Sequence, residues 1–271
     1  MFFTLKKSDR PIAVVRGGKH DKKTIYLTNV SPAKESKADI TEEEKEENEI
    51  RSIMKMLGIK KSEKGKFKHL EIMDGKIEMI PSEERECGYV SGPSGSGKSF
   101  FCAAYLKKLA GMYPKMPFIL FSKKNHDSQL DDIKNLQRFD MTDLEDLDSD
   151  MFVGSCCLFD DIDTLPLANK KACMLLRDQI LETGRSNMIY CLSTTHSMCS
   201  GKNTKFPLLE SHFCTMYPRF GDTYHLRYFM KFYGGLDKKQ IEKVLNLNSR
   251  SVTLFKRYPY YVLSDHELYL L

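Results

Sequence analysis

Hydrophobic and polar positions change their pattern near residue 85. Before it, short alternating stretches at 11–17, 24–30 and 69–80 predict strands. In the last stretch, Asp74-Gly75 lies between alternating apolar residues and predicts a hairpin, because a two-residue turn needs left-handed conformations that both tolerate. Residues 35–68 are largely charged and predict a solvated loop. We therefore expect a small strand-rich N-terminal part over 1–83, with its charged loop at about 35–68.

From residue 87 the pattern alternates between short apolar runs and longer helical stretches. An alternation of strands and helices predicts a mostly parallel sheet with helices on both faces, an α/β fold. After residue 236 a helix with Asp237 as its N-cap and two or three short strands are expected. The predicted strands are 88–92, 117–122, 155–162, 188–194 and 212–218, and the predicted helices are 99–112, 167–184, 222–234 and 236–247.

Composition sets the class of protein. A chain of 271 residues with 41% hydrophobic residues can bury a substantial core. It holds no apolar stretch of about 18 residues and no apolar segment at its N-terminus, so we expect a soluble, intracellular protein without a membrane-spanning segment. Its eight cysteines form no CxxC pair, and several lie in apolar runs, which predicts reduced core residues.

The charge is unevenly distributed. The net charge is +5, and residues 201–271 carry the whole excess, with 11 Lys and Arg against 6 Asp and Glu. A basic C-terminal end suits a polyanionic partner. An ordinary solvated surface fits the same numbers equally well.

A phosphate-binding motif stands between a predicted strand and a predicted helix. GPSGSGKS at 92–99 satisfies GxxxxGK[ST], in which backbone N–H groups converge on phosphate oxygens at a helix N-terminus. Lys98 is expected to contact the β- and γ-phosphates of ATP, and Ser99 to ligate Mg²⁺. The candidate nucleotide-binding residues are Gly92, Pro93, Ser94, Gly95, Ser96, Gly97, Lys98, Ser99 and Phe100.

Two acids follow another apolar strand. CCLFDD at 156–161 ends in Asp160 and Asp161, at the strand end where ligands collect in a parallel sheet. We expect Asp160 to hold Mg²⁺ and Asp161 to polarise the attacking water. The alternative is a solvated turn after the strand. A water-activating acid is typical of motors and helicases, whereas P-loop kinases usually need none there.

These motifs together resemble one superfamily. GPSGSGKS at 92–99, CCLFDDID at 156–163 and TGRSNMIYCLST at 183–194 resemble FtsK/HerA P-loop ATPases, and within them the poxvirus-type genome-packaging ATPases of large double-stranded DNA viruses. Residues 235–263 give a weaker match. The resemblance implies a RecA-like (ASCE) ATPase domain over 84–271, with a short C-terminal β extension at about 236–271.

The resemblance also implies roles around the strand at 188–194. That strand would lie between the phosphate-loop strand and the acid-tipped strand, with its tip at the γ-phosphate. His196 stands where related motors usually have a sensor glutamine, and Thr194 and Thr195 are adjacent candidates for sensing or for capping the strand end. Arg185 is either an arginine finger that reaches a neighbouring subunit's nucleotide or a structural partner of Glu182.

The function implied is an ATP-driven translocase that packages double-stranded DNA as a homo-oligomeric ring, a pentamer or hexamer. Capsid or portal proteins are expected partners, and the expected locations are the host cytoplasm, in the viral factory, and the virion. The sequence leaves two alternatives open. One is a P-loop kinase of a nucleotide or small metabolite; the other is a nucleotide-binding switch that does not hydrolyse ATP.

Overall fold

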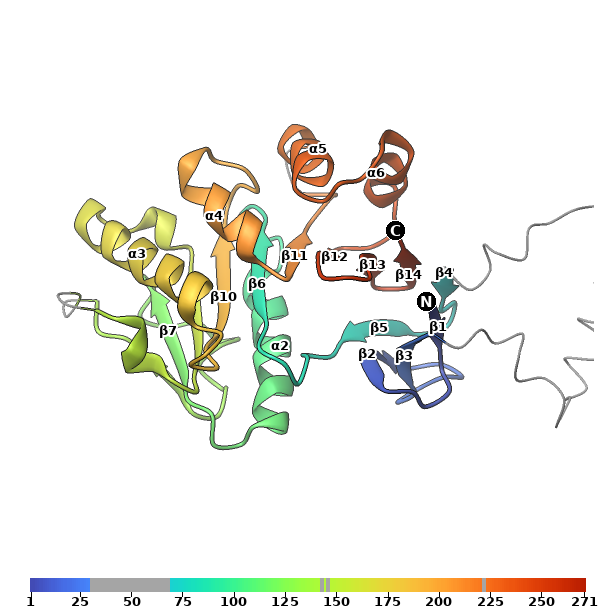
Figure 1. The fold of residues 1–271 in the computed structure, drawn as a ribbon, viewed down its shortest axis with the longest axis horizontal. Helices are drawn as coiled ribbons and strands as arrows, with labels where there is room; N and C mark the ends of the chain where they lie inside the picture. Colours follow the sequence, from blue (N-terminus) through green and yellow to red (C-terminus); the bar gives the residue numbers. More distant parts are fainter. Residues whose placement is uncertain (30–68, 142–143, 145–146, 221–222) are drawn as a thin grey trace, which may run out of the picture.

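The computed structural model describes residues 1–29, 69–141, 144, 147–220 and 223–271. The predicted charged loop at about 35–68 lies almost wholly outside these ranges. The described elements form a ten-stranded sheet, a four-stranded sheet and five α-helices (Figure 1). No helix within the described ranges is long and apolar enough to cross a membrane.

Six neighbouring strands of the large sheet are parallel: the five that the alternating pattern predicts and the short strand β8, which it does not predict. Their order is β11-β6-β10-β9-β7-β8. The loop strand β6 and the acid-tipped strand β9 therefore flank β10, which confirms the expected insertion. The strands are β6 (Cys87–Ser91), β7 (Phe118–Ser122), β8 (Leu136–Arg138), β9 (Cys156–Asp160), β10 (Tyr190–Thr195) and β11 (Phe213–Met216).

The C-terminal extension continues this sheet with antiparallel strands. Beyond β11 lie three strands in chain order, and β4 from the N-terminal part closes the edge. Because β12 pairs with β11, the extension is part of the large sheet. The strands are β12 (Val252–Phe255), β13 (Tyr261–Ser264), β14 (Glu267–Leu270) and β4 (His69–Glu71).

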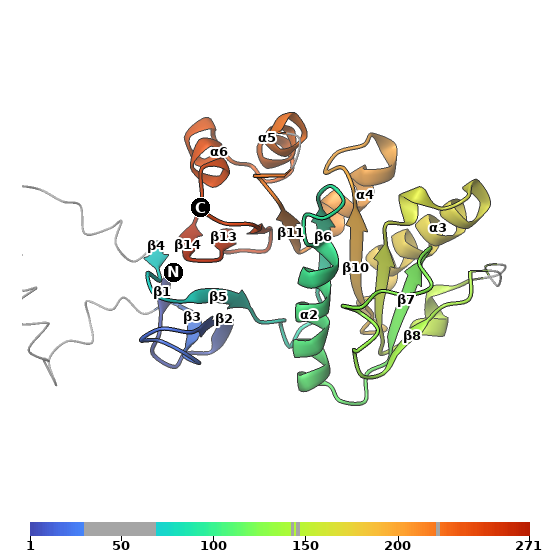
Figure 2. The ribbon, with the colours of Figure 1, turned by 180° about the vertical axis from the view of Figure 1, so that it is seen from behind.

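Helices cover both faces of the sheet. Helix α2 (Lys98–Met112) lies on one face, and the other four lie on the opposite face (Figures 1 and 2). Asp237 caps α6 as expected, in a capping box with Gln240. The four helices are α3 (Leu167–Thr183), α4 (Lys202–Glu210), α5 (Thr223–Phe232) and α6 (Lys238–Leu245).

Helix α4 was not expected from the sequence, because Pro207 lies inside it. A proline removes the hydrogen bond to the carbonyl four residues earlier, that of Asn203. The Arg177 guanidinium donates to that carbonyl at 3.3 Å. A buried arginine on α3 thus satisfies the group that Pro207 leaves unpaired.

The N-terminal strands form the smaller sheet, in the order β1-β3-β2-β5. Its strands are β1 (Phe2–Thr4), β2 (Arg10–Arg16), β3 (Thr24–Thr28) and β5 (Lys76–Met79).

The predicted hairpin at Asp74-Gly75 is wrong. Strand β4 pairs with β14 in the large sheet, whereas β5 pairs with β2 in the small one. The turn between β13 and β14 separates them, because the carbonyl of His266 accepts from Ile72 N–H and that of Asp265 from Ile77 N–H. Asp74 instead accepts a hydrogen bond from Lys19 N–H, in the turn between β2 and β3.

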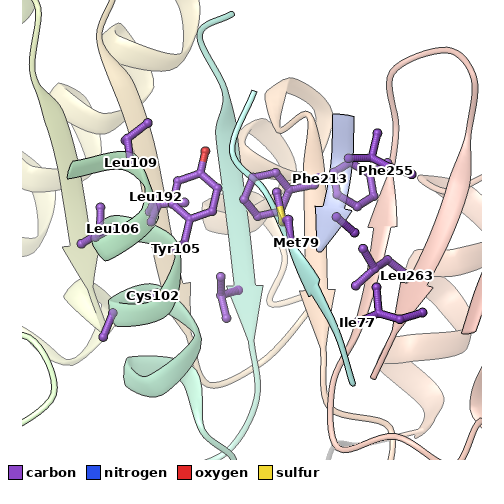
Figure 3. Close-up of a cluster of buried hydrophobic side chains, with 14 of the residues drawn as sticks. Ile77, Met79, Cys102, Tyr105, Leu106, Leu109, Leu192, Phe213, Phe255 and Leu263 are labelled. Carbon is purple, nitrogen blue, oxygen red and sulfur yellow. The ribbon is translucent and has the colours of Figure 1, made fainter. Parts of the chain in front are cut away.

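One hydrophobic core joins the two sheets. Side chains of α2, β11 and β12 meet Ile77 and Met79 of β5 (Figure 3). Seven of the eight cysteines are buried, and all seven lie in hydrophobic clusters, as predicted for core residues. The domain boundary near residue 83 stays a prediction.

Candidate active site

The phosphate-binding loop connects β6 to α2. Gly95 and Gly97 have φ values of 78° and 114°, which L-residues with side chains rarely adopt. The N–H groups of Lys98, Ser99 and Phe100 lie in the first turn of α2 and therefore have no acceptors within the helix. No side chain caps them either. The loop therefore presents backbone donors and the positive end of a helix dipole.

The predicted nucleotide-binding residues lie together on this loop. Ser94, Gly95 and Phe100 are exposed, and the side chain of Ser96 is buried. The Phe100 side chain is 68% exposed, and the group that Phe100 offers the site is its backbone N–H in the first turn of α2. Tyr217, just after β11, packs against the loop. A Cβ added to Gly92 would lie 2.7 Å from the Tyr217 ring.

Lys98 is almost fully buried and lies between the loop and the acids. Its Nζ donates to the Gly92 carbonyl at 2.8 Å and lies 3.5 Å from Asp161 Oδ1. The motif at 92–99 and Asp161, about 60 residues apart in the sequence, thus meet at one ammonium group.

Asp160 is buried at the carboxyl end of β9, between the two neighbouring strands. Ser122 at the end of β7 donates to its Oδ2 at 3.2 Å, and Thr194 near the end of β10 donates to its Oδ1 at 2.9 Å. Burial raises the pKa of this carboxyl, and the negative charge of Asp161 raises it further. No described residue forms an ion pair with Asp160.

These oxygens fit a magnesium ion. Mg²⁺ prefers hard oxygen ligands, and Asp160 offers a carboxylate whose only described partners are neutral hydroxyl groups. A cation would stabilise the charged form that burial disfavours. The donor set therefore suits the ion predicted from the sequence, with Asp160 and Ser99 as its candidate ligands.

Asp161 adopts a left-handed conformation with φ 46°, uncommon for a non-glycine residue. Thr194 stabilises it, because its hydroxyl accepts from Asp161 N–H at 2.8 Å. The carboxylate then reaches both Lys98 and His196, whose Nε2 lies 3.3 Å from Oδ2. A strained backbone at an acid beside a phosphate-binding loop is typical of functional sites.

The tip of β10 lies beside the acids, as the resemblance implies. Thr194 contacts both carboxylates, and its Oγ1 lies 3.1 Å from Asp161 Oδ1. Thr195 lies differently, because its hydroxyl donates to the Ser197 carbonyl at 3.4 Å while its own carbonyl accepts from Gly92 N–H. His196 is partly exposed and faces Asp161.

Arg185 lies away from these residues, in the turn before β10. Strand β10 separates the turn from the acids by about 20 Å. Arg185 is exposed and forms no ion pair with Glu182. Among the sequence-predicted site residues, Arg185 alone is thus remote from the others.

Two arginines that the sequence did not single out support the site. Arg85 is buried, and its guanidinium donates to the carbonyls of Ile180 and Ile189 on both sides of the turn that carries Arg185. Arg250 donates to the Ser96 and Gly95 carbonyls of the phosphate loop, at 2.8 and 3.0 Å. Arg85 lies outside the matched motifs, and Arg250 lies in the weakly matched stretch 235–263, where nothing in the sequence marks it as a partner of the phosphate loop.

Comparisons with known proteins add one clear relative. The uncharacterized protein V3 of Sputnik virophage is 33% identical over 270 residues, which is 98% of this chain and 97% of V3. No model of a known protein family matches the chain.

Solved structures are similar at greater distance. B204, the DNA-packaging ATPase of Sulfolobus turreted icosahedral virus, has a TM-score of 0.48 and 12% identity, over 68% of this chain and 99% of B204. The pCW3 conjugation coupling protein TcpA, with ATPγS, has a TM-score of 0.44 and 8% identity, over 96% of this chain and 76% of TcpA. At these TM-scores the likenesses support no conclusion on function.

Proposed function

We propose that this chain, which belongs to the same family as the V3 protein of Sputnik virophage, is an ATP-hydrolysing motor that translocates double-stranded DNA. One observation carries the proposal: Asp161 lies 3.5 Å from the phosphate-loop lysine Lys98, with the buried Asp160 beside it. A kinase or a passive switch needs the loop, but an acid in the position of Asp161 favours attack by water.

Binding of ATP would change the partners of Lys98. Its ammonium group now contacts Gly92 O and Asp161. The β- and γ-phosphates together carry more negative charge than the Asp161 carboxylate and would attract Lys98 away from it. The Asp161 carboxylate would then be free to accept a proton from the attacking water.

The remaining residues stabilise this arrangement. Ser99 and Asp160 would hold Mg²⁺, which supplies positive charge to the phosphates. Thr194 orients both carboxylates, and His196 provides a second donor toward Asp161 or the γ-phosphate. The site therefore couples the tip of β10 to the identity of the bound nucleotide.

The position of Arg185 supports a ring. Within one chain the length of β10 keeps it from the phosphate loop, so an arginine finger would have to act on a neighbouring subunit. Its turn is joined to the helix η3 (Ser149–Phe152), since Asn187 donates to Asp150 at 2.7 Å. Met151, Val153 and Met188 are exposed in these two segments, and exposed apolar side chains are typical of contact surfaces.

Two observations support a viral setting. The resemblance to genome-packaging ATPases and the relative from a virophage favour a motor that moves viral DNA into a capsid. The partners would be duplex DNA and capsid or portal proteins, in the host cytoplasm and the virion. The basic residues at 201–271 suit such a polyanion.

Two substitutions test the hydrolytic site. Lys98→Ala should weaken ATP binding at least tenfold, because the phosphates lose their main cation. Asp161→Asn should bind ATP at close to wild-type affinity yet hydrolyse it about 100-fold more slowly, because the amide is not a base. Nucleotide binding and phosphate release are measured separately.

Asp163→Asn is a matched control in the same FDDID segment and should hydrolyse ATP at near the wild-type rate. Hydrolysis by Asp161→Asn at the wild-type rate would contradict the role of the acid. Absence of ATP binding by the wild type would contradict the proposed function as a whole.

A further inference from the structure

We propose that Arg250 is a positioning residue that holds the phosphate loop in its anion-binding form. This inference rests on the proposed nucleotide binding at residues 92–99. Arg250 lies between α6 and β12, about 150 residues after the loop, and its guanidinium is the described side chain that bonds two successive loop carbonyls.

The two hydrogen bonds fix the direction of the loop's peptide groups. Arg250 Nε donates to the Ser96 carbonyl at 2.8 Å, and Nη2 donates to the Gly95 carbonyl at 3.0 Å. In a planar trans peptide, the carbonyl and the following N–H point in opposite directions. Holding the Ser96 carbonyl toward Arg250 therefore aims the Gly97 N–H away from Arg250.

The geometry of the loop makes this restraint necessary. Gly95 and Gly97 both have positive φ values, and glycine also adopts many other conformations. The Ser96 N–H already donates to the Pro93 carbonyl at 3.2 Å, so the Gly97 N–H and the first turn of α2 are left to bind the anion. A planar fork on two adjacent carbonyls restrains both flexible glycines.

The charge of Arg250 adds to the effect of its geometry. Hydrogen bonding to a cation polarises a peptide group and strengthens its N–H as a donor. The guanidinium also brings positive charge beside a site for phosphates. Both effects favour anion binding without contact between Arg250 and the ligand.

Arg250 is itself held in place by two contacts. Its backbone N–H donates to Asp265 Oδ2 at 3.1 Å, and its guanidinium lies 5.3 Å from the centre of the Phe220 ring. The Asp265 N–H donates to Ser249 Oγ at 3.0 Å, which joins the chain on both sides of β12 and β13. The C-terminal extension thus presents a fixed cation to the outer side of the loop.

Anion binding by variants tests the inference. Arg250→Ala should weaken the binding of ATP by about tenfold, as expected for the loss of charge-assisted hydrogen bonds at a partly exposed site. Arg250→Lys should be intermediate, because an ammonium group retains the charge but lacks the planar fork. Affinity is measured by displacement of a fluorescent ATP analogue, with thermal unfolding as the check on folding.

Inorganic tripolyphosphate separates an effect on the phosphate-binding loop from contact with the nucleoside. If Arg250 acts through the loop, Arg250→Ala weakens tripolyphosphate and ATP by the same factor. A loss confined to ATP would show that Arg250 contacts the nucleoside and would overturn the inference. Equal affinity of Arg250→Ala and the wild type for both anions would overturn it as well.

Two controls complete the experiment. Arg219→Ala removes a nearby arginine whose side chain bonds Asn248 and not the loop, and it should leave both affinities unchanged. Lys98→Ala reports on the loop itself. If the wild type binds ATP no better than Lys98→Ala, the proposed function fails. If Lys98→Ala loses ATP binding while Arg250→Ala binds ATP as tightly as the wild type, this inference alone fails.

Discussion

Asp160 and Asp161 are adjacent in the chain but have different surroundings. Asp160 is buried among hydroxyl groups, whereas Asp161 reaches a lysine and a histidine. The sequence predicted both acids and their strand end, because an apolar run followed by two acids is a local pattern. It could not show that Thr194, and not Thr195, joins them, since this depends on the register between β9 and β10.

Replacing Asp160 should stabilise the protein in the absence of nucleotide. Its pKa is raised in the fold, so at neutral pH its charge opposes folding. Asp160→Asn keeps the shape without the charge and should raise the melting temperature by a few degrees. The difference should shrink as the pH falls toward the carboxyl's raised pKa, because the protonated wild type is then also neutral.

Thr194→Val is the matched control at this cluster. It keeps the side-chain shape but removes the hydroxyl that serves Asp160 and Asp161, and it should lower the melting temperature. Thermal unfolding from pH 5 to pH 8, without nucleotide or divalent ions, measures both variants. A lower melting temperature for Asp160→Asn at neutral pH would contradict our account of this carboxyl.

Elements with a strong local pattern were predicted well. The buried parallel strands and α2, α3, α5 and α6 follow the apolar runs and helical periodicity of the sequence. The hairpin at Asp74-Gly75 failed because the turn at 265–266 takes the hydrogen bonds of both flanking strands. Helix α4 was missed because the compensation of Pro207 comes from Arg177, a residue distant in sequence.

The turn that carries Arg185 yields a prediction for the assembled protein. If Arg185 acts on a neighbour, Arg185→Ala subunits retain an intact phosphate loop, and Lys98→Ala subunits retain an intact arginine. Mixing the two variants should therefore restore ATP hydrolysis to at least several times the sum of their separate rates.

The matched control mixes wild-type subunits with subunits that carry both substitutions in one chain. Phosphate release is measured in assemblies whose mixed composition is confirmed by native mass measurement. If demonstrably mixed assemblies show no gain over the separate variants, Arg185 has a structural role and the trans arrangement is wrong.

In the whole molecule, the parallel sheet places the candidate site residues of several strands at the same end of the sheet. The ends of β6, β7, β9 and β10 meet beside the phosphate loop, and the C-terminal strands extend the same sheet. The mostly parallel sheet with helices on both faces was predictable from the alternating pattern. The core that α2 shares with the N-terminal sheet was not predictable, because its contacts link residues far apart in the sequence.

The central claim is that ATP hydrolysis by this chain drives movement along DNA. The most direct measurement is the rate of phosphate release from the full chain with Mg²⁺ and ATP, with and without linear duplex DNA at low salt. We predict a several-fold stimulation that is lost in Lys98→Ala and falls steeply as salt is raised, because DNA binding releases counterions. Hydrolysis that proceeds at one rate with and without duplex DNA would contradict the account.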